Sequence, residues 1–164
     1  MEASGDADPK LEIALRYLRR EGWVERGCIL FSQYLDTVLW LAERLAQAFP
    51  SRSVGIYGGQ GYSFLIDEDR RRGAAREEIQ KRVRDRSLSL LVATDAASEG
   101  LNLQRLETLI NVDLPWNPAR LEQRKGRIDR IGQLAASIDI LNLRYRGSVE
   151  DQVHDVLSTR LADP

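Results

Sequence analysis

The sequence is poor in the residues that form metal centres and covalent cross-links. Its 164 residues include one cysteine, Cys28, and one histidine, His154. A single cysteine excludes an internal disulfide and a cysteine-cluster zinc site. With only one histidine besides, the sequence offers no ligand set for a transition metal, and we expect no metal bound by this chain.

Long apolar segments are also missing. No uninterrupted apolar run approaches the roughly 18 residues that a membrane-spanning helix needs. Residues 1–9 have neither the basic nor the apolar region of a signal peptide. We therefore expect a cytoplasmic (intracellular) protein that does not contact a membrane, with residues 1–9 forming a flexible terminus.

Charge of one sign does not dominate either. The 24 Lys and Arg residues almost balance the 25 Asp and Glu residues, which gives a net charge of -1. This balance argues against a uniformly basic nucleic-acid-binding surface, although it leaves local basic patches open. With 43% hydrophobic and 30% charged residues, the composition is that of a soluble globular domain. We assign one domain to residues 10–164.

The apolar pattern alternates between helices and strands. Short continuous apolar runs predict buried strands, and amphipathic spacing predicts helices between them. This alternation is typical of an α/β domain with a mostly parallel sheet of about five to six strands and helices on both faces. The predicted strands cover residues 28–31, 54–57, 89–93, 108–112 and 138–143, and the predicted helices include 35–49, 70–86 and 118–131.

Residues 60–69 are predicted to form a loop with an unusual apolar patch at 64–66. The run ends in Asp67 and Glu68, as a Mg²⁺-binding strand would. However, it is short and continues directly into three arginines at 70–72. We interpret it as a loop whose acid caps the next helix, rather than as a metal site.

Polar segments follow several predicted strands, at the edge where α/β sheets bind ligands. They include residues 32–34, 58–59, 94–95 and 113–118. Each of them alone is explained equally well as an ordinary polar turn.

Residues 123–133 are harder to explain as a turn. Gln123, Arg127 and Arg130 are spaced four and three residues apart, so on a helix they share one face. Gly126 costs about 1 kcal/mol relative to alanine inside a helix, which indicates a close approach of backbone or ligand. Two arginines suit the charge of a transferring phosphoryl group, although a solvated helix face would show the same pattern.

The pattern Gln-x-x-Gly-Arg-x-x-Arg at 123–130, followed by Ile-Gly-Gln at 131–133, resembles motif VI of superfamily 2 helicases and translocases. Residues 94–103 resemble motif V, and residues 29–34 resemble motif IV. The Trp-Asn-Pro at 116–118 is similar to the Swi/Snf branch, and segments 121–124 and 129–133 are most similar to its bacterial, RNA-polymerase-associated type. The resemblance implies a three-layer RecA-like domain, the C-terminal lobe of a two-lobe motor.

The resemblance implies nucleotide-binding roles for five residues. Arg127 and Arg130 match arginine fingers, catalytic residues that reach the γ-phosphate of ATP held by the neighbouring lobe. Gln123 matches a residue that lines the same cleft. Gly100 and Asn102 match motif V positions that face the nucleotide, although Asn102 replaces the aspartate of DEAD-box relatives.

The resemblance also implies contact with nucleic acid, and double-stranded DNA is the expected partner. Thr94 matches a position that donates to a backbone phosphate. Ser32 and Gly58 lie on loops that follow the same strand. Neutral donors and backbone N–H groups can position a phosphate backbone without reading its sequence.

The chain lacks the P-loop pattern Gly-x-x-x-x-Gly-Lys-Ser/Thr, and no Gly-Lys dipeptide occurs in it. The resemblance therefore assigns ATP and Mg²⁺ to an N-terminal lobe of the same polypeptide. We expect this domain alone to be a monomer that binds neither ATP nor Mg²⁺ tightly and hydrolyses no ATP. The alternatives are a stand-alone nucleic-acid-binding or regulatory domain without hydrolase activity and, ranked last, an unrelated nucleotide or cofactor enzyme.

Overall fold

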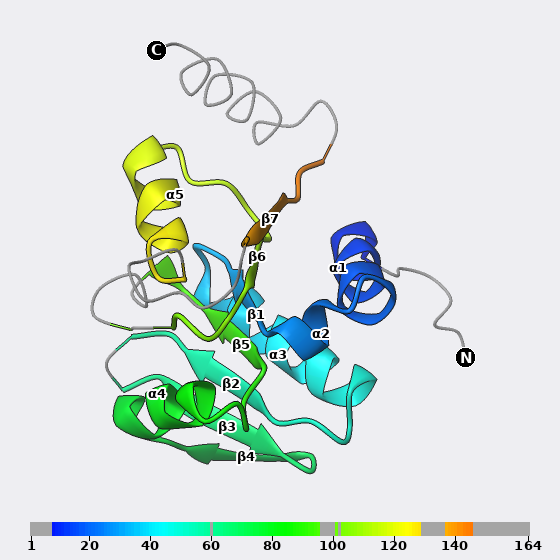
Figure 1. The fold of residues 1–164 in the computed structure, drawn as a ribbon, viewed down its shortest axis with the longest axis vertical. Coiled ribbons are helices and arrows are strands. Elements are labelled where there is room, and N and C mark those ends of the chain that lie inside the picture. Colours follow the sequence, from blue (N-terminus) through cyan, green and yellow to red (C-terminus); the bar gives the residue numbers. More distant parts are fainter. Residues whose placement is uncertain (1–7, 60, 96–100, 102, 129–136, 146–164) are drawn as a thin grey trace.

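The computed structural model describes residues 8–59, 61–95, 101, 103–128 and 137–145. They form one seven-stranded sheet with the order β4-β3-β2-β5-β1-β6-β7 (Figure 1). The prediction of a mostly parallel α/β fold is confirmed, with more strands than the five to six expected. The strands are β1 Cys28–Phe31, β2 Val54–Tyr57, β3 Ser63–Asp67, β4 Arg70–Gly73, β5 Leu90–Ala93, β6 Thr108–Asn111 and β7 Asp139–Asn142, and the helices are α1 Pro9–Arg20, α2 Trp23–Arg26, α3 Leu35–Ala48, α4 Arg76–Arg84 and α5 Pro118–Lys125.

The sheet separates two apolar cores, because neighbouring residues of a strand point to opposite faces. Cys28 and Leu30 of β1 join the core that α1, α2 and α3 cover. Ile29 and Phe31 of the same strand join the core that α4 and the leucines of residues 101–106 cover. All four residues of β1 are fully buried, which explains why this strand is a continuous apolar run.

The two strands that no predicted range covers, β3 and β4, form a hairpin, so the predicted loop at 60–69 and the predicted helix start at Arg70 were wrong. β3 pairs antiparallel with β2, and β4 pairs antiparallel with β3. Leu65 and Ile66 are buried in the sheet. Glu68 and Asp69 take positive φ angles of 49° and 66° in the tight turn between the strands. Strand pairing buries the apolar patch that the sequence pattern left without a partner.

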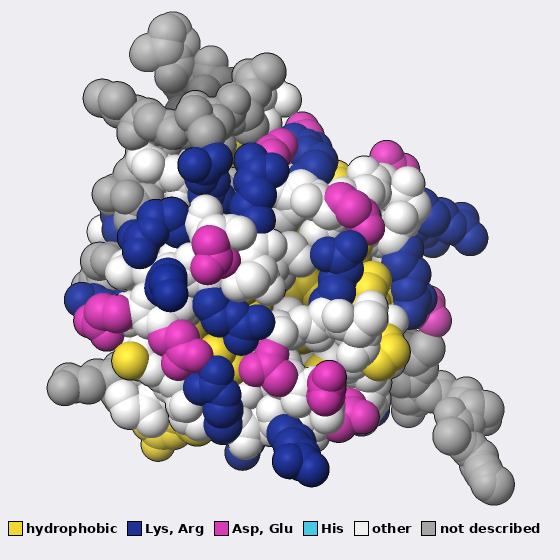
Figure 2. Space-filling model, turned by 60° about the horizontal axis from the view of Figure 1, so that its bottom comes forward, with side chains coloured by type: hydrophobic (Ala, Val, Ile, Leu, Met, Phe, Trp, Pro, Cys, Tyr) yellow, Lys and Arg dark blue, Asp and Glu magenta, His cyan; other side chains and the backbone are white. Residues whose placement is uncertain are grey.

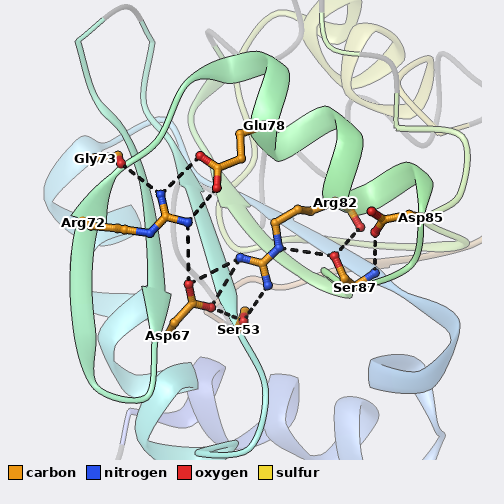
Figure 3. Close-up of polar contacts among 8 residues, drawn as sticks. All are labelled: Ser53, Asp67, Arg72, Gly73, Glu78, Arg82, Asp85 and Ser87. Carbon is orange, nitrogen blue, oxygen red and sulfur yellow. Dashed lines mark hydrogen bonds and ion pairs between the residues drawn. The ribbon is translucent and has the colours of Figure 1, made fainter.

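The hairpin is fastened to α4 by ion pairs and hydrogen bonds (Figure 3). Arg72 donates to both carboxylate oxygens of Glu78, at 2.6 and 3.2 Å. Arg82 donates to both oxygens of Asp67 at 3.4 Å. The Ser53 hydroxyl also donates to Asp67, and together with Arg82 it lowers the pKa of this carboxyl. Asp67 is thus held within the sheet edge and does not cap a helix.

Charged side chains of both signs cover the surface shown in Figure 2, where Lys and Arg alternate with Asp and Glu. On this face they do not gather into a patch of one sign, in keeping with the nearly balanced charge of the sequence. None of the helices in the described part of the chain has the length and apolar character needed to cross a membrane.

Candidate functional site

Three neighbouring parallel strands end at the same edge of the sheet and bring distant polar segments together. Phe31 of β1 pairs with Ala93 of β5 on one side and with Asn111 of β6 on the other. The residues that follow these strands, 32–34, 94–95 and 112–114, therefore lie side by side. This is the edge at which the sequence predicted a ligand site.

Ser32 and Asp113 join two of these segments. The Ser32 hydroxyl donates to Asp113 Oδ2 at 2.5 Å, and the Gln33 backbone N–H donates to Oδ1 at 2.9 Å. Ser32 also accepts from the backbone N–H of Tyr34 at 3.1 Å, and its side chain is fully buried. Ser32 thus fixes the loop after β1, and a direct contact between Ser32 and nucleic acid stays a prediction.

Arg124 of α5 occupies the centre of this edge and is the largest fully buried side chain of the described chain. It forms a two-pronged ion pair with Asp95, with Nε to Oδ1 at 2.5 Å and Nη2 to Oδ2 at 3.0 Å. Its Nη1 donates to Asn111 Oδ1 at 2.8 Å and to the Asp113 carbonyl at 3.0 Å. One guanidinium therefore ties α5 to the ends of β5 and β6.

Sequence reasoning missed Arg124, because it concentrated on the helix face with Gln123 and Arg127. The position of Asp95 could have indicated it, because Asp95 closely follows a buried strand. A carboxylate that is buried at such a position needs a cationic partner. Arg120 and Arg124 lie four residues apart on α5, and both approach Asp95, with Arg120 only at 3.9 Å.

The helix that was expected to carry the predicted arginines ends before them. We predicted a helix over 118–131, but α5 ends at Lys125, and Gly126–Ile128 form a turn. Gly126 is the C-cap, and its N–H donates to the Glu122 carbonyl at 2.9 Å. A Cβ at Gly126 would lie 3.3 Å from that oxygen, so the close approach inferred from this glycine is made by its own helix. Arg127 does not share a helix face with Gln123.

The turn after α5 is joined to the segment after β5. The Leu103 N–H donates to the Arg127 carbonyl at 3.1 Å. Arg127 Nη1 donates to the Leu101 carbonyl at 3.2 Å, and its side chain is half-buried. Next to it, Ile128 is fully buried in the core under α4. These contacts hold Arg127 at the carboxyl edge of the sheet, beside the predicted motif V.

Of the remaining predicted residues, three lie within the described part of the chain and three lie outside it. Gln123 is exposed on α5, and Thr94 lies buried at the end of β5, with its N–H donating to the Tyr57 carbonyl at 3.0 Å. Gly58 starts the loop after β2, where a Cβ would lie 2.6 Å from Leu35 Cδ1. The predicted positions Gly100, Asn102 and Arg130 lie outside the described residues.

The donor set of this edge suits an anion better than a cation. Within the described residues, no group of three or more His, Cys, Asp or Glu side chains is placed to hold a metal ion. The two carboxylates of the edge, Asp95 and Asp113, already accept from Arg124 and Ser32. Gln123 and Arg127 both carry N–H donors and both reach the surface.

Comparisons with known proteins agree with this geometry. Residues 10–132 match the family model described as the helicase conserved C-terminal domain. The chain is 36% identical over 138 residues to the uncharacterized ATP-dependent helicase YqhH of Bacillus subtilis (strain 168), covering 84% of this chain but only 22% of that protein. The fold resembles the crystal structure of the C-terminal part of the Fun30 ATPase domain, with a TM-score of 0.69, 19% identity and coverage of 90% of this chain and 43% of that chain.

Proposed function

Because the chain belongs to the helicase conserved C-terminal domain family, we propose that it is the second lobe of a Swi/Snf-type motor that moves on double-stranded DNA. An N-terminal lobe of the same polypeptide supplies the P-loop that this chain lacks. The chain spans about a fifth of the length of its curated relative, which leaves ample room for such a lobe. The subtype nearest to the sequence motifs is the bacterial, RNA-polymerase-associated one.

The observation that carries the proposal is the placement of Arg127. The turn after α5 and the segment after β5 are bonded to each other through Leu103 and Leu101, so Arg127 is preorganised at the edge of the sheet. The buried Arg124–Asp95 ion pair fixes α5 on the same edge. A preorganised guanidinium stabilises the charge that develops on a transferring phosphoryl group.

The donors of this edge fit the phosphate oxygens of a nucleotide held by the opposite lobe. ATP with Mg²⁺ supplies the phosphoryl group that is transferred to water. Arg127 supplies positive charge from this lobe, together with Arg130, and Gln123 lines the same cleft. The described residues offer no carboxylate cluster for the cation, so the proposal places Mg²⁺ on the N-terminal lobe.

The same edge of the sheet also supports a role for this lobe in the nucleic-acid groove. Thr94 and the loop that begins at Gly58 lie at the ends of two neighbouring strands, β5 and β2. Ser32 adds a third point through the loop that it anchors. The Ser32 hydroxyl and the backbone N–H groups of Thr94 and Gly58 already donate within the domain, so in this proposal they fix the shape of the loops. Loops of fixed shape can follow a phosphate backbone without reading its sequence, as a translocase requires.

The test compares single variants of the two-lobe parent protein. We expect Arg127→Ala to leave ATP affinity within a few-fold of the parent, and to lower kcat on the order of a thousandfold. Arg127→Lys keeps the charge but loses the planar fork, and we expect it to restore little activity. The matched control is Arg16→Ala, which removes an exposed arginine from α1.

Undiminished ATP turnover in Arg127→Ala would overturn the assignment. A melting temperature close to that of the parent shows that any loss does not come from unfolding. The isolated 164-residue chain is expected to release no phosphate from ATP, and release in proportion to its concentration would contradict the two-lobe proposal.

A further inference from the structure

Two serine-rich loops meet at the opposite, amino-terminal edge of the sheet. Residues 51–53 precede β2, and residues 87–89 precede β5. Since β2 and β5 are parallel neighbours with Val54 paired to Leu90, the two loops lie side by side. They border a hollow of about 310 Å³, lined by Ser51, Arg52, Ser53, Arg86, Ser87 and Ser89.

The lining of this hollow has the chemistry of an oxyanion site. It presents two guanidinium groups and four hydroxyls, and it includes no carboxylate. An adjoining hollow of about 380 Å³ shares residues 51–53, but Asp67 and Glu68 line it as well. The first hollow therefore suits an anion better than the second, with Asp67 and Asp85 accepting at its border from the Ser53 hydroxyl and the Ser87 N–H.

Several of the hydroxyls are held in place before any ligand arrives. Arg82 Nη2 donates to Ser53 Oγ at 2.9 Å, and Arg82 Nε donates to Ser87 Oγ at 3.3 Å (Figure 3). On the other side, Arg52 Nη1 donates to Ser89 Oγ at 3.2 Å. These bonds join the two loops and orient three of the four serines.

Arg86 contributes the second guanidinium of the hollow from an unusual backbone conformation. It follows the C-cap of α4 with φ at +66°, a left-handed conformation that glycine usually provides at this position. Its backbone N–H donates to the Val83 carbonyl at 3.1 Å. Its side chain is exposed, and among the described residues the structure gives it no ion-pair partner. An arginine in a conformation that favours glycine, with its guanidinium at the surface, is consistent with a use for that group.

One competing contact has to be exchanged when an anion binds. Arg52 Nη2 donates to Glu25 Oε1 at 3.0 Å, and the two side chains are 36% and 64% exposed. Exposed ion pairs of this kind contribute little to stability. A dianionic phosphate that meets Arg52 and Arg86 together can therefore replace Glu25 at small cost.

We propose that this hollow is a phosphate-binding site, separate from the helicase edge of the sheet. The ligand is a phosphate group, either free or carried by a nucleic-acid backbone. Arg52 and Arg86 supply charge, and the hydroxyls of Ser51 and Ser89, one from each loop, complete the set of donors. The hydroxyls of Ser53 and Ser87 already donate to Asp67 and to the Arg82 carbonyl. The site uses no residue assigned above to ATP or nucleic acid, so its test does not depend on the proposed motor function.

The experiment is an amide NMR titration of the 164-residue chain with inorganic phosphate, with chloride keeping the ionic strength constant. We expect the amides of residues 51–53 and 86–89 to shift and saturate together, with a Kd on the order of millimolar. Arg52→Ala and Arg86→Gly should each weaken binding about tenfold or more. Arg84→Ala removes an exposed arginine of α4 that does not line the hollow, and it should change the Kd less than about twofold.

Arg86→Gly separates binding from folding, because glycine relieves the left-handed strain. Its melting temperature should equal or exceed that of the parent while its phosphate affinity falls. Shifts that do not saturate, that chloride reproduces, or that survive both arginine variants would overturn the proposal.

A short DNA duplex forms the second arm of the titration. Movement of the same amides by the duplex, suppressed by inorganic phosphate, supports the site and identifies a nucleic-acid backbone as its source of phosphate. Saturation by inorganic phosphate alone supports the site and identifies a small phosphate.

Discussion

Replacing Arg124 by methionine tests whether the buried guanidinium holds the candidate site together. Methionine is long and apolar, so it occupies much of the same space without any hydrogen bond. In the variant, Asp95 loses two short bonds from Arg124, and Asn111 Oδ1 and the Asp113 carbonyl lose one each. Because Arg124 is fully buried and Asp95 is only 15% exposed, water replaces these partners poorly.

The expected loss is large relative to the stability of the domain. Removing one member of a buried ion pair costs about 3–5 kcal/mol, against a total of about 5–15 kcal/mol for a typical domain. Arg120→Met is the matched control, since that side chain is 54% exposed and only 3.9 Å from Asp95. Its expected cost is below about 1 kcal/mol.

Urea unfolding of the 164-residue chain, followed by tryptophan fluorescence and circular dichroism, measures the difference. At a typical urea dependence, Arg124→Met should move the midpoint down by about 2 M. Adding Asp95→Asn to Arg124→Met removes the stranded charge, and should recover part of the loss with a coupling of about 0.5–3 kcal/mol. Equal midpoints for Arg124→Met and Arg120→Met would refute the reasoning.

Three further predictions concern other parts of the fold. Burial raises the pKa of the Cys28 thiol to about 12. Alkylation of this thiol near pH 8 should therefore be on the order of a thousandfold slower in the native chain than in the chain unfolded in guanidinium. Rapid labelling of the native chain would contradict this burial. The hydrogen bond from Ser53, and to a smaller extent the charge of Arg82, lowers the pKa of Asp67. The ionised carboxylate therefore stabilises the fold above its unfolded pKa of about 3.9. This contribution to stability is lost as the pH falls through the lower pKa of the folded state. Asp67→Asn should therefore flatten the dependence of the unfolding free energy on pH below about 4, and an unchanged slope would argue against the contact. Gly27 has φ +88°, and a Cβ there would lie 3.3 Å from the Leu106 backbone, so Gly27→Ala should lower the free energy of unfolding by about 2 kcal/mol. Gly73 has open space around it, so Gly73→Ala should cost less than about 1 kcal/mol. Similar losses of stability in both variants would refute the argument.

The buried strands could be predicted from the sequence because burial on both faces favours a continuous run of apolar residues. β1, β2, β5 and β6 have all of their residues buried, so each is a short run without the polar alternation of a surface strand. The hairpin could not be predicted in this way. β4 is an exposed edge strand made of three arginines and a glycine, and arginine favours helices when no neighbouring strand is considered.

The candidate site was predictable in its location but not in its connections. Strand ends mark the carboxyl edge of the sheet, which placed Ser32, Thr94 and the 113–118 segment in one region. The contacts of Arg124 depend on β5, β1 and β6 being neighbours, and this order is not written in any single segment. The end of α5 was also missed, since Gly126 was interpreted as a site of close approach inside a helix and not as its C-cap.

The composition of β4 has a consequence for solubility. A free strand edge exposes backbone groups to which a second copy of the chain can add, which is a common start of aggregation. Here, an edge-to-edge pairing of two β4 strands would place the guanidiniums of Arg70, Arg71 and Arg72 against those of the other copy, and like charges on paired strands repel. The charged hairpin therefore both extends the sheet beyond β2 and protects its open edge from self-association.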